Sequence, residues 1–195
     1  MVNRSDIETF WTRGDIHSRI HKAMTEAGLN DRKLEIEDLF PIDQYHARGI
    51  AATVDLGKRM PILENQRIID IGCGLGGPAR YFAKEFKCLI TGIDITPSFI
   101  EIGNKFNNLT SMSKKVSLQI GNGETLDFED ESFDGGYPQH VTMNIKNRKE
   151  FFWESQGPEA PFGTPEKPII SKMLYGEIDT FLFARIKEKN RSKTN

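Results

Sequence analysis

Two amphipathic segments lie in the first third of the chain. In the first, Ser5 followed by Glu8 has the form of a capping box, a pair of side chains that often begins a helix. From there to Ala27, apolar residues recur at close to helical spacing, at Ile7, Phe10, Ile16, Ile20 and Met24. In the second, residues 45–60 again have a helical pattern, and Pro61 should end it because proline disfavours helical geometry in the residue before it. The pattern predicts an N-terminal helical cap over residues 1–60.

From Arg67 onward the chain alternates between two patterns. Short apolar runs, typical of buried strands, are separated by stretches with helical spacing. This alternation predicts βαβ units and so an α/β, Rossmann-like fold with a mostly parallel sheet. We expect strands near residues 67–71, 88–93, 115–120 and 133–137. We expect helices near 77–86, 97–109 and 148–154, the second beginning with Thr96 as N-cap and Pro97 at its first position.

Residues 155–195 do not continue this alternation. The stretch SQGPEAPFGTPEKP, residues 155–168, is rich in proline and glycine, which sustain neither a helix nor a central strand. Beyond it, one strand could lie near 178–186, and the polar, lysine-rich end is expected to be disordered. The sequence therefore predicts a helical cap (1–60), a sheet core (61–154) and a divergent linker and tail (155–195).

Composition argues against several classes of partner. The 195 residues include 26 lysines and arginines and 28 aspartates and glutamates, with no long run of one sign. This argues against electrostatic binding to nucleic acid or an anionic membrane and favours a small-molecule partner. No stretch approaches the roughly 18 apolar residues of a membrane span, and no apolar leader follows Met1. Since Cys73 and Cys88 also lack disulfide-framework spacing, we expect a soluble, cytoplasmic protein with reduced thiols.

A glycine-rich turn carries the main chemical signal. Gly72, Gly74 and Gly77 follow a predicted strand and open a predicted helix, in the GxGxxG form of nucleotide-binding turns. Glycines there allow positive φ and let a ligand lie against the backbone, but they do not distinguish NAD from S-adenosylmethionine. Asp70 does, because a carboxylate beside the turn repels a pyrophosphate and attracts a methionine ammonium. The alternative is a structural strand-to-helix corner without a ligand.

A second acid ends the next predicted strand. Asp94 stands where a carboxylate can accept hydrogen bonds from both ribose hydroxyls. Because a ribose is common to both cofactors, Asp94 supports a nucleoside ligand without choosing between them.

Taken together, these segments resemble a known family. IIDIGCGLGGPARYFA and TGIDIT resemble class I S-adenosylmethionine-dependent methyltransferases, especially the group of sarcosine/dimethylglycine N-methyltransferases. The resemblance implies that the first acid and its glycines line the methionine end of the cofactor and that Asp94 binds the ribose. In GNGETLDFEDESFDGGYPQH it implies an approach to the adenine by Asn122. The cofactor contacts expected on this basis are Asp70, Gly72, Cys73, Gly74, Gly76, Asp94, Ile95, Asn122, Gly123 and Gln139.

The segment IDQYHARGIAATVDL also resembles that group, in which the helix entering the sheet domain helps to cover the cofactor. This makes Gln44, Tyr45, His46 and Gly49 candidates to face the methionine or the methyl acceptor. Methyl transfer is an in-line displacement, so the enzyme mainly holds the nucleophile close to the methyl group, and a base is optional. For an amine acceptor, His46 or His140 could take the proton, while Tyr45 and Gln139 orient the substrate.

We expect no metal site, because His17 and His21 stand four apart without a third ligand.

The family pattern stops after the segment MNI. No fifth to seventh strand can be recognised, although these usually complete the sheet and much of the acceptor pocket. Three functions therefore remain open: methyl transfer to a small molecule, most simply an amine nitrogen; cofactor binding by a degenerate or truncated protein; and a nicotinamide-dependent oxidoreductase. An uncovered fourth strand would also present unpaired backbone groups, which would allow a homodimer through that edge.

Overall fold

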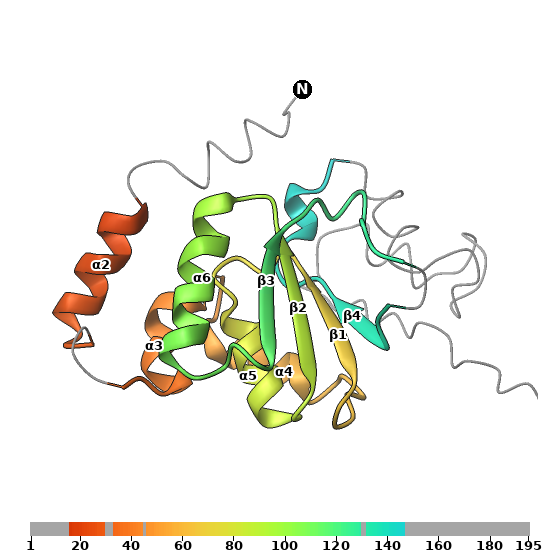
Figure 1. Cartoon of the computed structure of the whole chain (residues 1–195), viewed down its shortest axis with the longest axis horizontal. Coiled ribbons are helices and arrows are strands. Elements are labelled where there is room, and N and C mark those ends of the chain that lie inside the picture. The colour runs from red at the N-terminus through yellow and green to blue at the C-terminus, as the bar shows by residue number, and fades with distance from the viewer. Residues whose placement is uncertain (1–15, 30–32, 45, 130–131, 147–195) are drawn as a thin grey trace, which may run out of the picture.

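The computed structural model describes residues 16–29, 33–44, 46–129 and 132–146. Its centre is a sheet of four parallel strands in the order β3-β2-β1-β4, formed by β1 (Arg67–Ile71), β2 (Leu89–Asp94), β3 (Val116–Ile120) and β4 (Gly135–Tyr137). The expected α/β, Rossmann-like class is therefore confirmed. Figure 1 shows the four strands side by side, with β3 and β4 at the edges of this described sheet.

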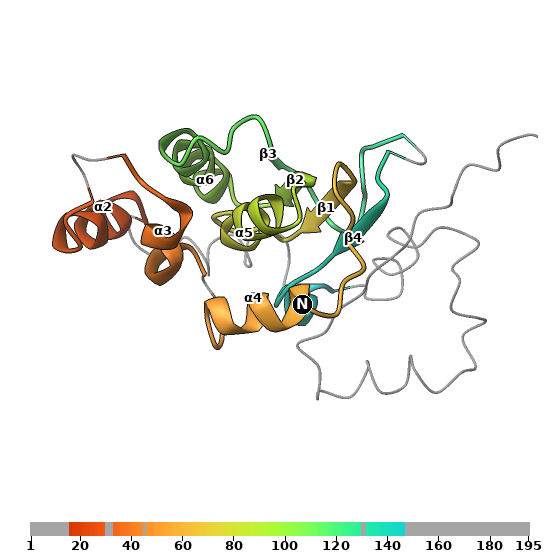
Figure 2. The same cartoon turned by 90° about the horizontal axis from the view of Figure 1, so that it is seen from below.

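The crossover helices cover one face of the sheet. Helices α5 (Gly77–Glu85) and α6 (Pro97–Leu109) connect β1 to β2 and β2 to β3, as the alternating pattern predicts. Both pack on the strands that they connect, and Figure 2 shows them on the same side of the sheet. Thr96 is the N-cap of α6 and Pro97 lies in its first turn, as expected.

Three N-terminal helices pack outside this layer. They are α2 (Ile16–Glu26), α3 (Ile36–Asp43) and α4 (Ile50–Gly57). Helix α2 contacts α3 and α6, whereas α3 and α4 contact α5. The expected helix over 45–60 begins only at Ile50, because Arg48 and Gly49 have φ angles of 67° and 51° and cannot continue an α-helix. Helix α3 was not expected, and its backbone is capped locally where Glu35 N–H donates to Asp38 Oδ2 at 2.9 Å.

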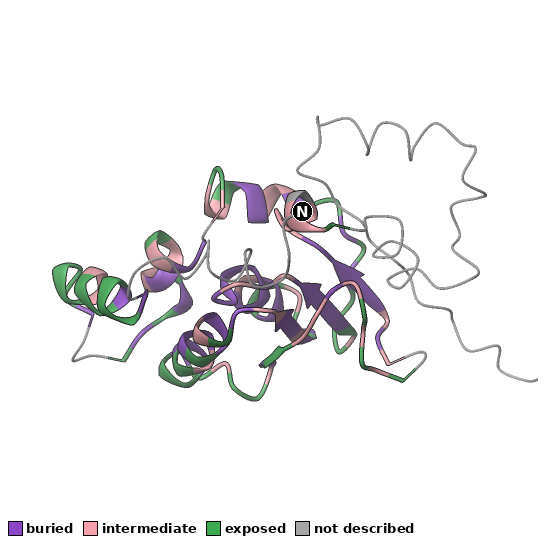
Figure 3. Cartoon of the chain, turned by 90° about the horizontal axis from the view of Figure 1, so that it is seen from above, coloured by how far each residue is buried: buried purple, intermediate pink, exposed green. Residues whose placement is uncertain are grey.

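The strands alternate between two apolar clusters. Ile68, Ile90 and Tyr137 lie in a core with Phe82 of α5, whereas Ile69, Ile71 and Ile93 pack on the other face with Phe133. A third cluster joins α2 and α3 to α6. Figure 3 shows the strands almost entirely buried, so the sheet is a rigid base for the loops at its carboxyl edge.

Other expectations fall elsewhere. The first part of the predicted N-terminal helix (residues 5–15), the helix near 148–154 and all of 155–195 lie outside the described residues. A short 3₁₀ helix, η1 (Thr142–Asn144), follows β4. Within the described part of the chain, no helix is both long and apolar enough to cross a membrane.

Candidate functional site

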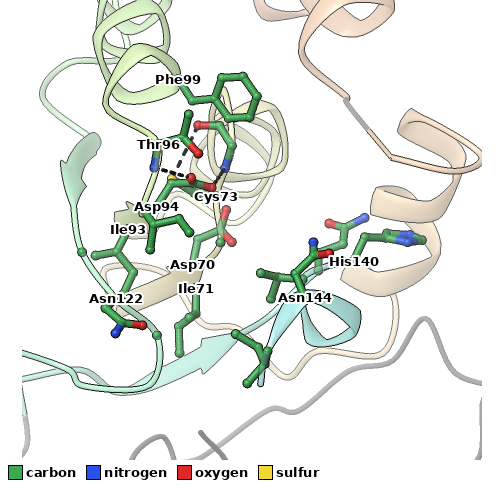
Figure 4. Close-up of a pocket in the computed structure, with 18 of the residues that line it drawn as sticks. Asp70, Ile71, Cys73, Ile93, Asp94, Thr96, Phe99, Asn122, His140 and Asn144 are labelled. Carbon is green, nitrogen blue, oxygen red and sulfur yellow. Dashed lines mark hydrogen bonds between the residues drawn. The ribbon is translucent and has the colours of Figure 1, made fainter. Parts of the chain in front are cut away.

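A cavity of about 340 Å³ opens at the carboxyl ends of all four strands. This is where open α/β sheets bind ligands, beside the point at which the strand order reverses from β1 to β4. Most of its wall consists of segments 70–75, 93–96, 121–124 and 139–146 without 142 and 143, joined by Asp43, His46, Pro78 and Phe99. Residues far apart in the chain therefore meet at one place (Figure 4).

Two glycines of the turn have different roles. Gly72 and Gly74 both have left-handed φ angles, 81° and 53°, which a residue with a Cβ adopts only with strain. A Cβ on Gly72 would collide with the side chain of Val141, so protein fills that space. At Gly74 nothing lies within 4 Å of the Cβ position. The expected open approach to the backbone is therefore found at Gly74, while Gly72 is required by packing.

Gly76 lies away from the cavity, although the family resemblance placed it among the cofactor contacts. It is not part of the cavity wall, and a Cβ there would lie 2.7 Å from Leu118 Cδ1 and 3.2 Å from Arg80 Nη1. Its lack of a side chain allows the turn to pack on β3.

Asp70 is an acid held almost out of water. It lies near the end of β1, lines the cavity and is 1% exposed. Burial raises the pKa of Asp70 to about 7, although the Tyr137 hydroxyl beside it lowers the value, and the charge of Asp94 adds to the rise. Neither Asp70 Oδ2 nor Tyr137 Oη completes a hydrogen bond of good geometry. A positively charged ligand group would therefore be favourable here.

Asp94 connects the glycine turn to the start of α6. Its Oδ2 accepts a hydrogen bond from Gly74 N–H at 3.0 Å and its Oδ1 accepts one from Thr96 N–H at 2.9 Å (Figure 4). Burial raises the pKa of Asp94, and these backbone donors oppose the rise. Because each carboxylate oxygen can accept a second bond, Asp94 can hold the turn and still receive a diol.

The loop after β3 forms another side of the cavity. Gly121, Asn122 and Gly123 all line it, and Ile95 faces the same space. Asn122 Oδ1 accepts a hydrogen bond from Glu124 N–H at 3.0 Å, which fixes the turn. Glu124 Oε1 accepts one from Lys146 N–H at 3.0 Å and so joins this loop to the segment after β4.

Two histidines and a glutamine form the opposite wall. The rings of His46 and His140 stack with centroids 4.7 Å apart and planes 4° from parallel. His140 has a φ of 56°, a strained value for a residue with a side chain, so the fold holds this ring in place at a cost. Gln139 Nε2 lies 3.2 Å from His46 Nε2. The structure thus brings together three of the four residues expected at the acceptor; the fourth, Tyr45, lies outside the described residues.

Some expected and some unexpected residues stand near this wall. Gln44 and Gly49 do not line the cavity: Gln44 is buried behind it and Gly49 is the N-cap of α4. Asp43 and Val141 do line it, although sequence reasoning missed both. An acid at the end of an apolar helix could have marked Asp43, whereas no local pattern marks Val141. Among the described residues, no group of three or more potential ligands could hold a metal ion.

Comparison with known proteins agrees with this geometry. The family described as "Methyltransferase domain" matches residues 69–157, which include the glycine turn and both acids. This part of the chain is a class I methyltransferase domain. The expectation drawn from the motifs is confirmed at this level.

Relatives of the methyltransferase domain differ in the atom they are named for. A sterol 24-C-methyltransferase of Debaryomyces hansenii is 36% identical over 89 residues, which cover 46% of this chain and 24% of that protein. The O-methyltransferase rstn1 of Aspergillus nomiae is 31% identical over 97 residues, covering 50% and 43%. A solved structure of phosphoethanolamine N-methyltransferase 2 of Haemonchus contortus, in complex with phosphomonomethylethanolamine and S-adenosylhomocysteine, aligns with a TM-score of 0.51 and 26% identity over 54% of this chain and 25% of that one. The chain thus spans less than half the length of these relatives.

Proposed function

We propose that the cavity binds S-adenosylmethionine and that the protein transfers the cofactor's methyl group to a small molecule. The observation that carries this proposal is the meeting of Asp70, Asp94 and the open face of Gly74 in one cavity. A buried acid with a raised pKa disfavours a phosphate and favours an ammonium, which argues against a nicotinamide dinucleotide. The residues present therefore fit the sulfonium cofactor.

Each part of the wall would hold a different part of the cofactor. Asp70 and the backbone at Gly74 would bind the amino-acid end, and Asp94 would accept hydrogen bonds from the ribose. The apolar side chains of Ile71, Ile93 and Ile95, with the turn at Asn122, would enclose the base. When bound, the cofactor supplies an electrophilic methyl group on its sulfur. The protein then needs to hold an acceptor in line with that group and exclude water.

We propose an amine nitrogen as the acceptor and His46 as the group that takes its proton. His46 Nδ1 lies 3.2 Å from the carbonyl oxygen of Ala47, which can only accept, so Nδ1 carries the hydrogen of the neutral ring. The lone pair is then on Nε2, on the side of Gln139. An amine must be unprotonated when it attacks, so a nearby imidazole lone pair would assist.

The test is transfer of a labelled methyl group from S-adenosylmethionine to panels of small amines, hydroxyl compounds and alkenes. We expect label in an amine, and loss of about 100-fold or more in kcat for His46→Gln. His17→Gln is the matched control, because His17 lies on helix α2 outside the cavity wall. Transfer to oxygen or carbon alone would contradict the nitrogen assignment. Tight binding of S-adenosylhomocysteine without transfer to any panel would favour a cofactor-binding protein that has lost turnover.

A further inference from the structure

A buried hydroxyl lies directly behind the histidine wall. Thr53 in α4 is 0% exposed and is not part of the cavity lining. Its Oγ1 donates to Gln44 Oε1 at 2.7 Å, and Gln139 Nε2 donates to the same Oγ1 at 3.1 Å. Thr53 Oγ1 also lies 3.3 Å from His46 Nε2 and 3.5 Å from Gln139 Oε1. One hydroxyl therefore touches all three polar side chains of this cluster.

The direction of these hydrogen bonds is set from outside the cluster. Arg80, which is fully buried, donates from Nη2 to Asp43 Oδ2 at 3.0 Å and fixes that carboxylate. Asp43 Oδ1 and Gln44 Nε2 both lie within 2.8 Å of the point where a Cβ of Gly77 would stand. An amide N–H beside a carboxylate is the favourable arrangement, and the opposite orientation would place two oxygens together. Gln44 therefore presents its oxygen to Thr53.

A hydroxyl has one proton, so the shortest contact decides where it goes. The proton points to Gln44 Oε1 at 2.7 Å, which leaves Thr53 Oγ1 as an acceptor toward Gln139. The amide nitrogen of Gln139 consequently faces the cluster and can also donate to His46 Nε2 at 3.2 Å. A donor at Nε2 favours the ring form in which that nitrogen is unprotonated.

We propose that Thr53 is a positioning residue that keeps His46 in the tautomer with hydrogen on Nδ1 and the lone pair on Nε2. The residue acts through the orientation of the Gln139 amide and touches neither cofactor nor acceptor. Its relevance to catalysis rests on the proposed function, in which His46 takes a proton. The tautomer itself is a property of the protein alone and can be measured without an acceptor.

The experiment is nuclear magnetic resonance of imidazole nitrogens in ¹⁵N-labelled full-length protein at pH about 8, where an ordinary histidine is neutral. The chain has four histidines, and a His46→Gln variant assigns the signals of His46. The wild type should show an unprotonated Nε2 and a protonated Nδ1. In Thr53→Val, which removes the hydroxyl at similar size, the Gln139 amide can turn over, and the two nitrogen shifts should move toward each other. Thr53→Ser, which keeps the hydroxyl, should give wild-type shifts.

Three outcomes would overturn the proposal: a wild-type ring protonated on Nε2, wild-type shifts in Thr53→Val, or equal changes in the valine and serine variants. If Thr53→Val does not fold, Thr53→Ala replaces it, and the wild-type spectrum alone still decides the tautomer. Titration of each folded variant with S-adenosylhomocysteine runs in parallel and should give dissociation constants within about twofold of the wild type. A wild type that fails to bind would contradict the proposed function while leaving the tautomer result to stand by itself.

Discussion

At the scale of single residues, Asp70 shows a conflict between stability and binding. Its pKa is raised to about 7 by burial, compared with about 3.9 for an unfolded aspartate. The folded state therefore holds a proton that the unfolded state releases between those values. It follows that the contribution of this group to stability is full below about pH 4 and is lost as the pH rises through about 7.

Replacing Asp70 with asparagine should stabilise the free protein. At pH 8 the free energy of unfolding should rise by about 1–3 kcal/mol, less than the full pKa difference would give, because a buried acid relaxes its surroundings. Chemical denaturation at pH 5 and pH 8 measures this, and the gain should be much smaller at pH 5. A variant that is less stable than the wild type at pH 8 would mean that the charged form of Asp70 stabilises the fold.

The same substitution should remove a pH dependence of binding. Because an ammonium requires the ionised acid, the affinity for S-adenosylhomocysteine should rise by up to about tenfold per pH unit below pH 7 and level off above it. Asp70→Asn should bind weakly with a flat profile. Parallel profiles for the two proteins would remove Asp70 from the site.

The glycine turn gives a matched pair of substitutions. Gly72→Ala should reduce stability by about 2–4 kcal/mol, since strained backbone and overpacking against Val141 add together. Gly74→Ala should cost only about 1–2 kcal/mol of backbone strain but should prevent ligand binding, because its methyl group enters the open space of the cavity. Thermal unfolding and titration with S-adenosylhomocysteine distinguish the two. Recovery of Gly72→Ala stability by adding Val141→Ala would identify the contact, and a Gly74→Ala protein that binds normally would contradict this assignment.

How far single residues can be predicted depends on whether their role is local. Asp70, Gly74 and Asp94 stand in a motif whose spacing fixes them at strand ends, so their meeting in one cavity could be expected. Val141 and Thr53 act on Gly72 and Gln139, which are distant in sequence, and nothing in their own neighbourhood indicates that contact. Pairings of that kind come from the fold.

At the scale of elements, helix ends could be predicted where the backbone decides them. The helix expected at 97–109 has those bounds, since Thr96 and Pro97 set its start. The expected 45–60 helix is shorter because left-handed residues precede Ile50, which side-chain periodicity does not reveal. Strand β4, expected over 133–137, pairs only over three residues, although Asp134 N–H still donates to the Arg67 carbonyl at 2.7 Å.

One buried ion pair joins the outer helices to the sheet layer. Asp43→Asn should lower the free energy of unfolding by about 3–5 kcal/mol, because it leaves the guanidinium of Arg80 buried without its charge partner. Glu37→Gln is the matched control, since Glu37 pairs with Lys84 between the same two helices but at the surface, where a pair contributes at most about 1 kcal/mol. Denaturant unfolding at pH 7 measures both. Equal losses for the two variants would mean that the buried pair does not hold α3 on α5.

At the scale of the whole molecule, the strand order explains why one cavity collects the chemistry. The chain moves outward from β1 to β3 and returns to β4 on the other side of β1, so the loops after β1 and β4 separate and leave space between them. The sequence pattern predicted the parallel sheet and its strands.

The edge of the sheet leads to a prediction about assembly. Among the described residues, β4 pairs with one strand, β1. We predict that two copies associate through this edge, which would satisfy backbone groups that are otherwise unpaired. Light scattering coupled to size-exclusion chromatography should then give twice the 22.2 kDa mass of one chain. A concentration-independent monomer would contradict this prediction.

The central claim is that the cavity between Asp70 and Asp94 is a site for S-adenosylmethionine. Calorimetric titration with S-adenosylhomocysteine and with NAD tests it most directly, in the wild type and in Asp94→Asn, which keeps one acceptor oxygen for the turn. We predict one saturable site for S-adenosylhomocysteine, no measurable binding of NAD, and an affinity weakened by about 1.5–3 kcal/mol in Asp94→Asn. Saturable binding of NAD, or no binding of S-adenosylhomocysteine by the folded wild type, would contradict the claim.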